Sequence, residues 1–431
     1  MRSSTRSLVA VVAVAVCGAI VASDTRGQVP APAAADRLAY LGLPPPGDTP
    51  IVFAPGDVST DAREINAVFS RDGRELYVTR VVDGRASLYV RRVQGDTWTT
   101  PVRLAPVADQ PDADVADPAL SPDGQRLYFV SGARNDLFPP GNGNIWVSRR
   151  DGDGWGPAVI LPVPVNSSAA EYYPSVVADG SLYFSSNRDG GAGDLDLYRA
   201  QYADGAFTTV VNLGASINTP QTEVDAYVAP DERMLIVSAR RDGNRGALDL
   251  YVSVRSADGA WGPLVHMGDV VNTDLTDYCP MVTPDGRFFF FSRRTAQGGD
   301  IYWMRASVLD QFRPGRTTKS SGLILAVVEE GAGPVAQPGQ YVLIHETTSF
   351  EDGRVYFTTS GRKPLRFLLG GNQVIAGVDE GVTGMRVGER RRLIVPPALS
   401  RRSAYPDGLS PNATLHYDVT LVAIEPPGVA R

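Results

Sequence analysis

The chain is poor in the residues that build reactive and cross-linked sites. Its 431 residues include two cysteines and three histidines. Cys17 falls in a predicted leader, so Cys279 has no disulfide partner in the mature chain. His266, His345 and His416 are each isolated in the sequence, which favours structural histidines over a zinc site or a Ser-His-Asp triad. We therefore predict a protein without a metal or other cofactor.

A basic surface of the kind that binds nucleic acid is also missing. The net charge is -7 and the pI is about 5.2, and basic residues cluster only at 390–392 and 401–402. We interpret these short clusters as solvated strand edges and expect no nucleic-acid partner. Neither a phosphate-binding P-loop nor a glycine-rich dinucleotide motif is present. The acidic turns at 151–154 and 187–191 lack the terminal glutamate of a calcium loop, so we interpret them as hairpin turns.

An apolar run marks the N-terminus. Arg2 and Arg6 precede the segment Leu8–Ala22, which is short for a membrane span. Small residues end this run just before Asp24. Residues 1–23 are therefore predicted to be a signal peptide for export to the bacterial periplasm or the medium, and no membrane span is expected after its removal.

This leader has two alternative interpretations, and a linker is expected after it. One alternative is a lipid anchor at Cys17, although Val16 fits such a site poorly, and the other is an uncleaved anchor. Residues 24–49 are rich in alanine and proline. Such a composition buries little apolar surface, so we predict an extended linker from 24 to 49.

Between residues 50 and 314, a turn followed by an apolar strand recurs five times. One copy is the turn Ser121-Pro122-Asp123-Gly124 before Leu127-Tyr128-Phe129. Proline presets φ in such a turn, aspartate bonds the backbone and glycine accepts a positive φ. The aspartates of the five turns are Asp72, Asp123, Asp179, Asp231 and Asp285. Their successive separations are 51, 56, 52 and 54 residues. A period of about fifty residues indicates one supersecondary unit stacked repeatedly.

Further strands follow the turn units. A third strand such as Asp249–Ser253 comes next, and a fourth follows the Trp-Gly-Pro turns at 155–157 and 261–263. Four antiparallel strands with this period form a propeller blade, and the repeats resemble the TolB-type propeller repeat. Pro50–Pro55 matches the fourth strands, so we expect it to complete the last blade and remove free sheet edges. The prediction is a mainly β chain with a five-bladed propeller at 50–314, and six blades is the alternative.

Residues 322–426 follow a short polar linker predicted at 315–321 and precede a tail at 427–431. Their motifs, in sequence order, are Glu351-Asp352-Gly353, Lys363-Pro364, Gly370–Gly377, Glu380-Gly381-Val382 and Asn412–Leu415. In order and spacing these motifs resemble the FKBP-type peptidyl-prolyl isomerases. The resemblance implies an α+β domain, in which an antiparallel sheet wraps a short helix, and activity on proline-containing peptides or proteins. The helix is expected at 373–380, with Asn372 as its cap and Gly381 at its end.

The chemistry implied by the resemblance needs an apolar cup. Prolyl isomerisation requires no nucleophile, because its barrier of about 18–20 kcal/mol comes from amide resonance. A dry cup disfavours the charge-separated resonance form, and a twisted bound amide is part of the way to the transition state. The resemblance implies that six residues form the cup, namely Tyr356, Phe367, Val374, Ile375, Val378 and Tyr417. It also implies that the backbone N–H of Ile375 donates to the ligand carbonyl.

The positions around the predicted cup depart in part from the family pattern. The family's tryptophan floor is Val378 here, which forfeits stacking area. A wall tyrosine is Glu346, whose charge Arg401 would have to neutralise, and Arg401 itself replaces a tyrosine that bonds ligand. These changes predict isomerase activity that is weak or lost. Two other surrounding positions, Phe357 and Leu365, also differ in residue type from the family. Tyr405 and Leu409 lie on the loop that overhangs the cup.

Three functions are compatible with the sequence. The first is an exported prolyl isomerase or folding factor whose propeller docks on an unknown envelope protein. The second is a non-catalytic envelope scaffold in which both domains bind proteins. The third and least favoured is a propeller glycoside hydrolase. It would need a ring of carboxylates in the central funnel at Asp117, Glu171, Asp225 and Asp277.

Overall fold

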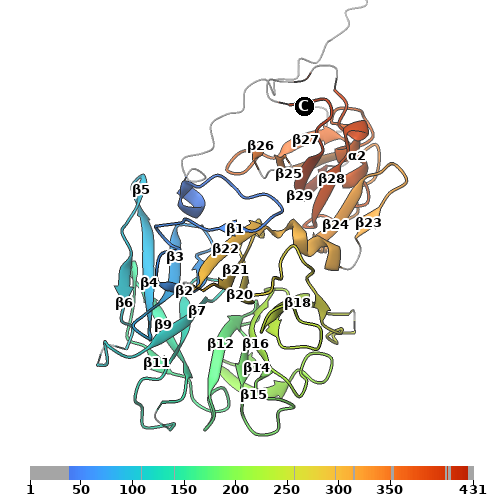
Figure 1. Cartoon of the computed structure of the whole chain (residues 1–431). Coiled ribbons are helices and arrows are strands. Elements are labelled where there is room, and N and C mark those ends of the chain that lie inside the picture. Colours follow the sequence, from blue (N-terminus) through green and yellow to red (C-terminus); the bar gives the residue numbers. More distant parts are fainter. Residues whose placement is uncertain are drawn as a thin grey trace, which may run out of the picture.

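The part of the chain that the computed structural model describes is 38–425, except 108, 140, 257, 297, 314–315, 351–353, 403–404 and 406–408. It consists of five small sheets and one larger C-terminal sheet (Figure 1). The predicted signal peptide, most of the predicted linker, the Glu351-Asp352-Gly353 motif and the tail at 427–431 lie outside the described residues. Within the described ranges, no helix has the length and apolar character to cross a bilayer.

Each small sheet is a propeller blade of antiparallel strands that are consecutive in the chain, with the first strand innermost. Blade 1 consists of β2 (Arg63–Phe69), β3 (Glu75–Val82), β4 (Arg85–Gln94), β5 (Thr97–Trp98) and β6 (Val102–Leu104). Blade 2 consists of β7 (Val115–Leu120), β8 (Arg126–Ser131), β9 (Asn144–Asp151), β10 (Gly154–Trp155) and β11 (Val159–Ile160). Blade 3 consists of β12 (Glu171–Val176), β13 (Leu182–Ser186), β14 (Asp196–Ala203) and β15 (Ala206–Asn212). Blade 4 consists of β16 (Glu223–Val228), β17 (Met234–Ala239), β18 (Asp249–Val254) and β19 (Val265–His266).

Blade 5 is closed by the start of the chain. It consists of β20 (Thr276–Val282), β21 (Phe288–Arg294), β22 (Asp300–Arg305) and β1 (Ile51–Val52). Ile51 lies opposite Trp303 in this pairing. The prediction of five blades with closure by the N-terminal strand is confirmed, and the alternative of six blades is wrong. Closure removes the exposed edge that an open propeller would present.

Residues 38–49 are not an extended linker, which corrects the prediction for the described part of 24–49. They include the 3-10 helix η1 (Ala39–Gly42), and Tyr40 is only 5% exposed. Its ring packs edge-on against Phe69 and Phe288, with centroids 5.0 and 4.7 Å away. The overall alanine and proline content concealed a local run of large apolar residues. This run packs over the contact between blades 5 and 1.

The C-terminal domain is an antiparallel sheet with one helix, α2 (Ala376–Val382). Its strand order is β23 (Thr317–Thr318), β24 (Ile324–Glu329), β28 (Arg390–Val395), β29 (Leu415–Glu425), β25 (Tyr341–Ser349) and β26 (Val355–Thr358), and β27 (Leu365–Leu368) also pairs with β25. Two 3-10 helices are η2 (Ala306–Phe312), which leads out of blade 5, and η3 (Pro397–Leu399). Thr317 and Thr318 were predicted to be linker, but they pair with β24.

Helix α2 begins and ends later than predicted. Asn372 does not cap it, because this residue has a φ of 54° in a turn, and the N-cap position is Ile375. Gly381 lies inside the helix rather than at its end. A Cβ on Gly381 would lie 2.4 Å from Cδ1 of Leu393 on β28. The glycine is therefore required for close packing of helix on sheet, a cause that the sequence pattern does not reveal.

Two arginines of β28 join the domains. The Arg392 guanidinium donates to the Asp310 carboxylate at 2.9 Å, and that of Arg390 donates to the Asp285 carbonyl at 2.6 Å. Their side chains are only 11% and 15% exposed. The prediction of a solvated strand edge at 390–392 is therefore wrong for these two residues, because a second domain covers this face. Helix α2 lies at the end of the domain that is away from the propeller (Figure 1).

Candidate functional site

The residues predicted for the cup converge in one buried cluster. Tyr356 on β26, Phe367 on β27 and Tyr417 on β29 share it with Ile375 and Val378 at α2. These five residues are between 2% and 6% exposed. Leu409 is a full member of the cluster, and the partly buried residues that pack against it include Phe357, Leu365, Val374 and Tyr405.

Strand alternation explains why these side chains meet. Along β29 the buried positions alternate with less buried ones, which places Tyr417 on the face that packs toward α2. Along β25 the same alternation places Glu346 on the apolar face, after Val342 and Ile344. Glu346 is 3% exposed. A carboxyl group has therefore been built into the apolar layer beside the cup.

The basic residue that reaches the cup differs from the one that the sequence suggested. Arg401 is exposed and forms no ion pair with Glu346 in the described part of the chain. Arg402 instead lies with its Nη2 3.5 Å from the Tyr417 hydroxyl. Sequence reasoning missed Arg402 because two neighbouring arginines cannot be told apart without coordinates.

Two donors at the cup have no acceptor among the described residues. One is the backbone N–H of Ile375, which precedes α2 with φ -64° and ψ 150°. The other is the hydroxyl of Tyr356, which is buried. An unsatisfied buried donor costs about 1–3 kcal/mol. The N–H of Ile375 is the group that the family resemblance assigns to a ligand carbonyl.

One apolar side chain of the overhanging loop lies in the cup cluster. Leu409 is 6% exposed and packs in the same cluster as Tyr356 and Val378. Protein interiors are close-packed, so a proline ring has to displace a side chain in order to enter. Leu409 is the best candidate for displacement, because it comes from a loop and not from the sheet or helix.

A second group of candidate residues lies in the propeller channel. The innermost strands of blades 2 to 5 each contain a bulge, and the residue there has a φ between 48° and 55°. These residues are Asp117, Tyr173, Asp225 and Cys279. The Tyr173 hydroxyl of blade 3 donates to the Pro280 carbonyl of blade 5 at 3.0 Å. The Cys279 thiol lies 3.5 Å from the Asp225 carboxylate, so the bulge residues meet in the channel.

The ring of four carboxylates proposed for a hydrolase does not form. Asp117 and Asp225 lie at the bulges, whereas Glu171 and Asp277 lie two residues before the bulges of their strands. In the sequence the four acidic residues appear equivalent, but relative to the bulges they occupy two different positions along the strands. Glu171 and Asp277 instead hold the strand ends, through ion pairs at 3.0 and 2.6 Å with Arg188 and Arg293.

Asp117 and Asp225 share an enclosed environment. Burial raises the pKa of Asp117 to about 7, and the charge of Asp225 adds to this shift. Burial also raises the pKa of Asp225 to about 6, against the opposing hydrogen bonds from Cys279. The pair therefore retains a proton close to neutral pH. Burial raises the pKa of the Cys279 thiol as well, so this thiol is a poor nucleophile.

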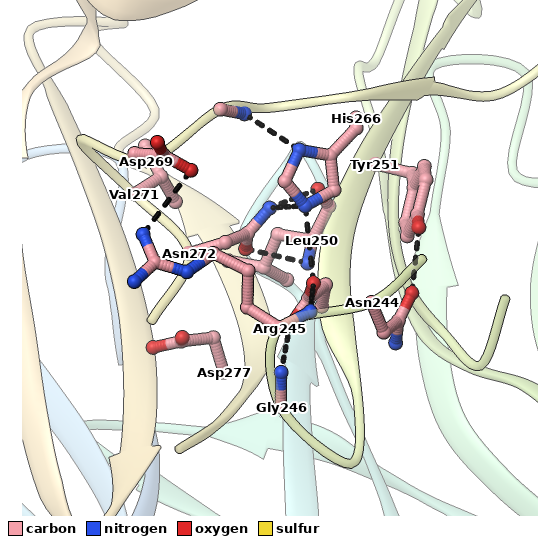
Figure 2. A network of polar contacts seen from close by, with 12 residues as sticks. Asn244, Arg245, Gly246, Leu250, Tyr251, His266, Asp269, Val271, Asn272 and Asp277 are labelled. Atoms are coloured by element: carbon pink, nitrogen blue, oxygen red, sulfur yellow. Dashed lines mark hydrogen bonds and ion pairs between the residues drawn. The ribbon is translucent and has the colours of Figure 1, made fainter. Parts of the chain in front are cut away.

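His266 belongs to a polar network in blade 4 (Figure 2). Its Nε2 lies 3.0 Å from Oδ2 of the buried Asp249, and the backbone N–H of Gly268 donates to its Nδ1 at 3.1 Å. Nδ1 therefore accepts the Gly268 N–H, while Nε2 faces both the Asp249 carboxylate and the Asn272 amide nitrogen, the latter at 2.9 Å. In blade 3 the corresponding aspartate is bonded by Asn212 at 2.8 Å. His266 therefore replaces an asparagine in a contact that holds a strand end. In the described ranges, no cluster of three or more His, Cys, Asp or Glu side chains is placed to hold a metal.

Fold and cup together define a two-part protein: a β-propeller followed by a small α+β domain with an apolar cup. The sequence model of the FKBP-type peptidyl-prolyl cis-trans isomerases matches residues 333–422. The FK506-binding protein of Streptomyces anulatus is 42% identical over 106 residues, which are 24% of this chain and 86% of that protein. FK506-binding protein 2 of Candida glabrata is 46% identical over 92 residues, or 21% of this chain and 68% of that protein. Through its C-terminal domain the chain belongs to this family.

The family model covers only part of the chain, residues 333–422. FK506-binding protein 4 of Mycosarcoma maydis is 42% identical over 110 residues, which cover 25% of this chain but only 29% of that protein. Among solved structures, FkpA from Escherichia coli is 33% identical and covers 27% of this chain and 54% of that chain, with a TM-score of 0.25. Each of these two matches covers about a quarter of this chain.

Proposed function

We propose that this protein is an exported peptidyl-prolyl cis-trans isomerase or folding factor whose propeller docks on an envelope protein. The observation that carries the proposal is the convergence of Tyr356, Phe367, Ile375, Val378 and Tyr417 in one apolar cluster of a family domain. The leader at 1–23 supports export. The propeller contacts the domain through β28 and leaves α2 uncovered, which supports a docking role that does not block the cup.

The proposed mechanism relies on desolvation and twisting of the X-Pro amide. The aromatic rings of Tyr356, Phe367 and Tyr417 and the side chain of Val378 would surround the proline ring and exclude water. An apolar surround lowers the stability of the charge-separated planar amide and so lowers the barrier to rotation. The N–H of Ile375 would hold a neighbouring peptide carbonyl and orient the substrate.

The alternative is a non-catalytic scaffold in which both domains bind proteins. The buried Glu346 and the packing of Leu409 in the cup cluster favour it, because a polar group beside the cup and a side chain within its cluster both oppose entry of a proline ring. The two candidates agree on peptide binding and differ on turnover.

A protease-coupled assay on X-Pro peptides, with the full chain, separates these candidates. We expect a rate above the spontaneous one, which has a time constant of about tens to hundreds of seconds. A rate equal to the spontaneous one, together with measurable peptide binding, would support the scaffold instead. Absence of both would remove the family function from this chain.

A substitution at Ile375 tests the proposed donor. The backbone there has φ -64°, which proline adopts without strain, so Ile375→Pro removes the N–H and little else from the backbone. The matched control is Ile375→Val, which keeps the N–H and has a side chain of similar size. We expect the proline variant to show a KM about 2- to 12-fold above that of the valine variant, as for the loss of one hydrogen bond. Equal KM values would show that the N–H does not bind substrate.

A further inference from the structure

One polar group of the cup has no partner. The Tyr356 hydroxyl is closed off from solvent and makes no hydrogen bond in the described part of the chain. Tyr356 as a whole is only 6% exposed. Buried hydroxyl groups in proteins usually have a hydrogen-bond partner, and one without a partner is destabilising. A group of this kind in a candidate site points to a ligand that supplies the partner.

The surroundings of the Tyr356 ring are apolar. Tyr356 is the buried position of β26, and its neighbours along the strand are less buried. Its ring packs edge-on against Phe350, with centroids 5.8 Å apart, and shares one cluster with Ile375, Val378 and Leu409. Although Tyr356 also lines the cleft between the two domains, its hydroxyl oxygen does not reach solvent there. The acceptor is therefore expected from a molecule that enters the cup.

The substrate of the proposed isomerase offers few suitable acceptors beside its proline. The N–H of Ile375 already takes a neighbouring peptide carbonyl in the proposed mechanism. A hydrogen bond to the X-Pro carbonyl itself would favour the planar, charge-separated amide and so raise the barrier to rotation. The proline nitrogen has no free electron pair until the amide has twisted. The side chain of X, the residue joined directly to the proline, remains as the acceptor.

The chemistry of the cup selects among side chains that contain oxygen. A carboxylate would carry its charge into an apolar site, beside the carboxyl group of the buried Glu346. A primary amide would bring two N–H donors that need acceptors of their own. A hydroxyl group can accept a bond from Tyr356 and turn its own proton toward a nearby backbone carbonyl of the substrate. Serine and threonine therefore fit this environment best.

We propose that the Tyr356 hydroxyl binds the side-chain hydroxyl of the residue before proline, so that Ser-Pro and Thr-Pro segments are the preferred substrates. The inference rests on the proposed isomerase function and adds the class of substrate to it. The observation that carries it is the unpartnered Tyr356 hydroxyl within the cup cluster. Tyr356 thus selects the substrate, in addition to excluding water with its ring.

The test compares two peptides that differ only at X, which is threonine in one and valine in the other. These side chains have nearly the same shape, and only threonine carries a hydroxyl. Protease-coupled kinetics with the full chain give kcat/KM for each peptide. We expect the ratio of the threonine value to the valine value to be about 2- to 12-fold higher in the wild type than in Tyr356→Phe, as for one hydrogen bond. The wild type and the variant should turn over the valine peptide equally.

Two controls accompany this comparison. Tyr341→Phe removes a hydroxyl from β25 in the same sheet, at a tyrosine outside the cup cluster, and should leave the ratio unchanged. The Tm of Tyr356→Phe should be no lower than that of the wild type, because the hydroxyl has no partner to lose. A lower Tm would show that the hydroxyl stabilises the fold, and this would overturn the inference. An equal loss for both peptides would assign the hydroxyl to the peptide backbone and would also overturn the preference.

Peptide binding separates this inference from the isomerase function. The Kd values of the same two peptides, labelled with a fluorophore, are measured by anisotropy for the wild type and Tyr356→Phe. Turnover or binding with an unchanged ratio would overturn the substrate preference but not the isomerase. Binding with the expected change of ratio and no turnover would support the preference and remove the isomerase. If neither peptide is bound or turned over, both are overturned.

Discussion

At the scale of single residues, we expect Leu409 to control access to the cup. It is buried in the same cluster as the cup residues. Leu409→Ala should raise kcat/KM for X-Pro peptides, because it vacates the volume that a proline ring needs. It should also lower the free energy of unfolding by about 2–5 kcal/mol. Protease-coupled kinetics and urea unfolding measure the two effects.

The matched control is Leu415→Ala. Leu415 is fully buried in the same cluster but lies on β29, so its removal should cost similar stability without opening the cup. If both variants change activity in the same way, Leu409 does not occupy the proline site.

Residue identities at the cup were predictable to the extent that motifs fix them. The sequence placed Tyr356, Ile375 and Tyr417 correctly in one cluster because strand alternation and the family spacing constrain them. Whether each residue contacts substrate stays a prediction. The role of Arg402 was not accessible, since it depends on a loop conformation that no local pattern specifies.

At the scale of secondary-structure elements, the turn motifs predicted the structure more accurately than the residues expected to begin and end the helix. The Pro-Asp-Gly turns predicted the hairpins because they need specific dihedral angles, as the φ of 70° at Gly124 shows. The limits of α2 were mispredicted because Asn372 and Gly381 have other roles. One residue forms a left-handed turn, and the other allows the helix to approach β28.

Gly381→Ala tests that role. Helix propensity alone predicts a gain of about 1 kcal/mol for alanine. We expect a net loss of up to about 2 kcal/mol instead, because the added Cβ would lie 2.4 Å from Cδ1 of Leu393 and overpacking costs about 1–3 kcal/mol. Denaturant unfolding measures the change. In a Leu393→Ala background the same substitution should become neutral or stabilising, and a loss of equal size there would refute steric packing as the cause.

At the scale of the whole molecule, contacts between distant segments were the least predictable. No sequence pattern indicated that Tyr40 would pack on blades 5 and 1, or that Arg390 and Arg392 would join the domains. Such contacts depend on which surfaces meet after each domain has folded, and a periodic pattern reports only which face of an element is apolar. Blade number and closure were predictable because both follow from counting repeats.

The propeller channel gives a prediction about the stability of the whole ring. Asp117 and Asp225 have pKa values of about 7 and about 6 in the folded state, raised from 3.8. The folded protein therefore retains protons that the unfolded chain releases above about pH 4. Their stabilising contribution is complete in acid and is lost as the pH rises from about 4 to about 7.

Asp117→Asn should remove much of this loss. We expect a higher Tm than that of the wild type at pH 8, by about 2–4 °C for each kcal/mol gained, and a difference that shrinks toward pH 4. The control is Asp61→Asn at an exposed aspartate outside the channel, which should leave the pH profile unchanged. Thermal unfolding followed by circular dichroism between pH 4 and 8 measures both. If the Tm difference between Asp117→Asn and the wild type does not change with pH, the channel carboxyls do not share a proton. Repulsion between Asp117 and Asp225 would then not affect the stability of the propeller.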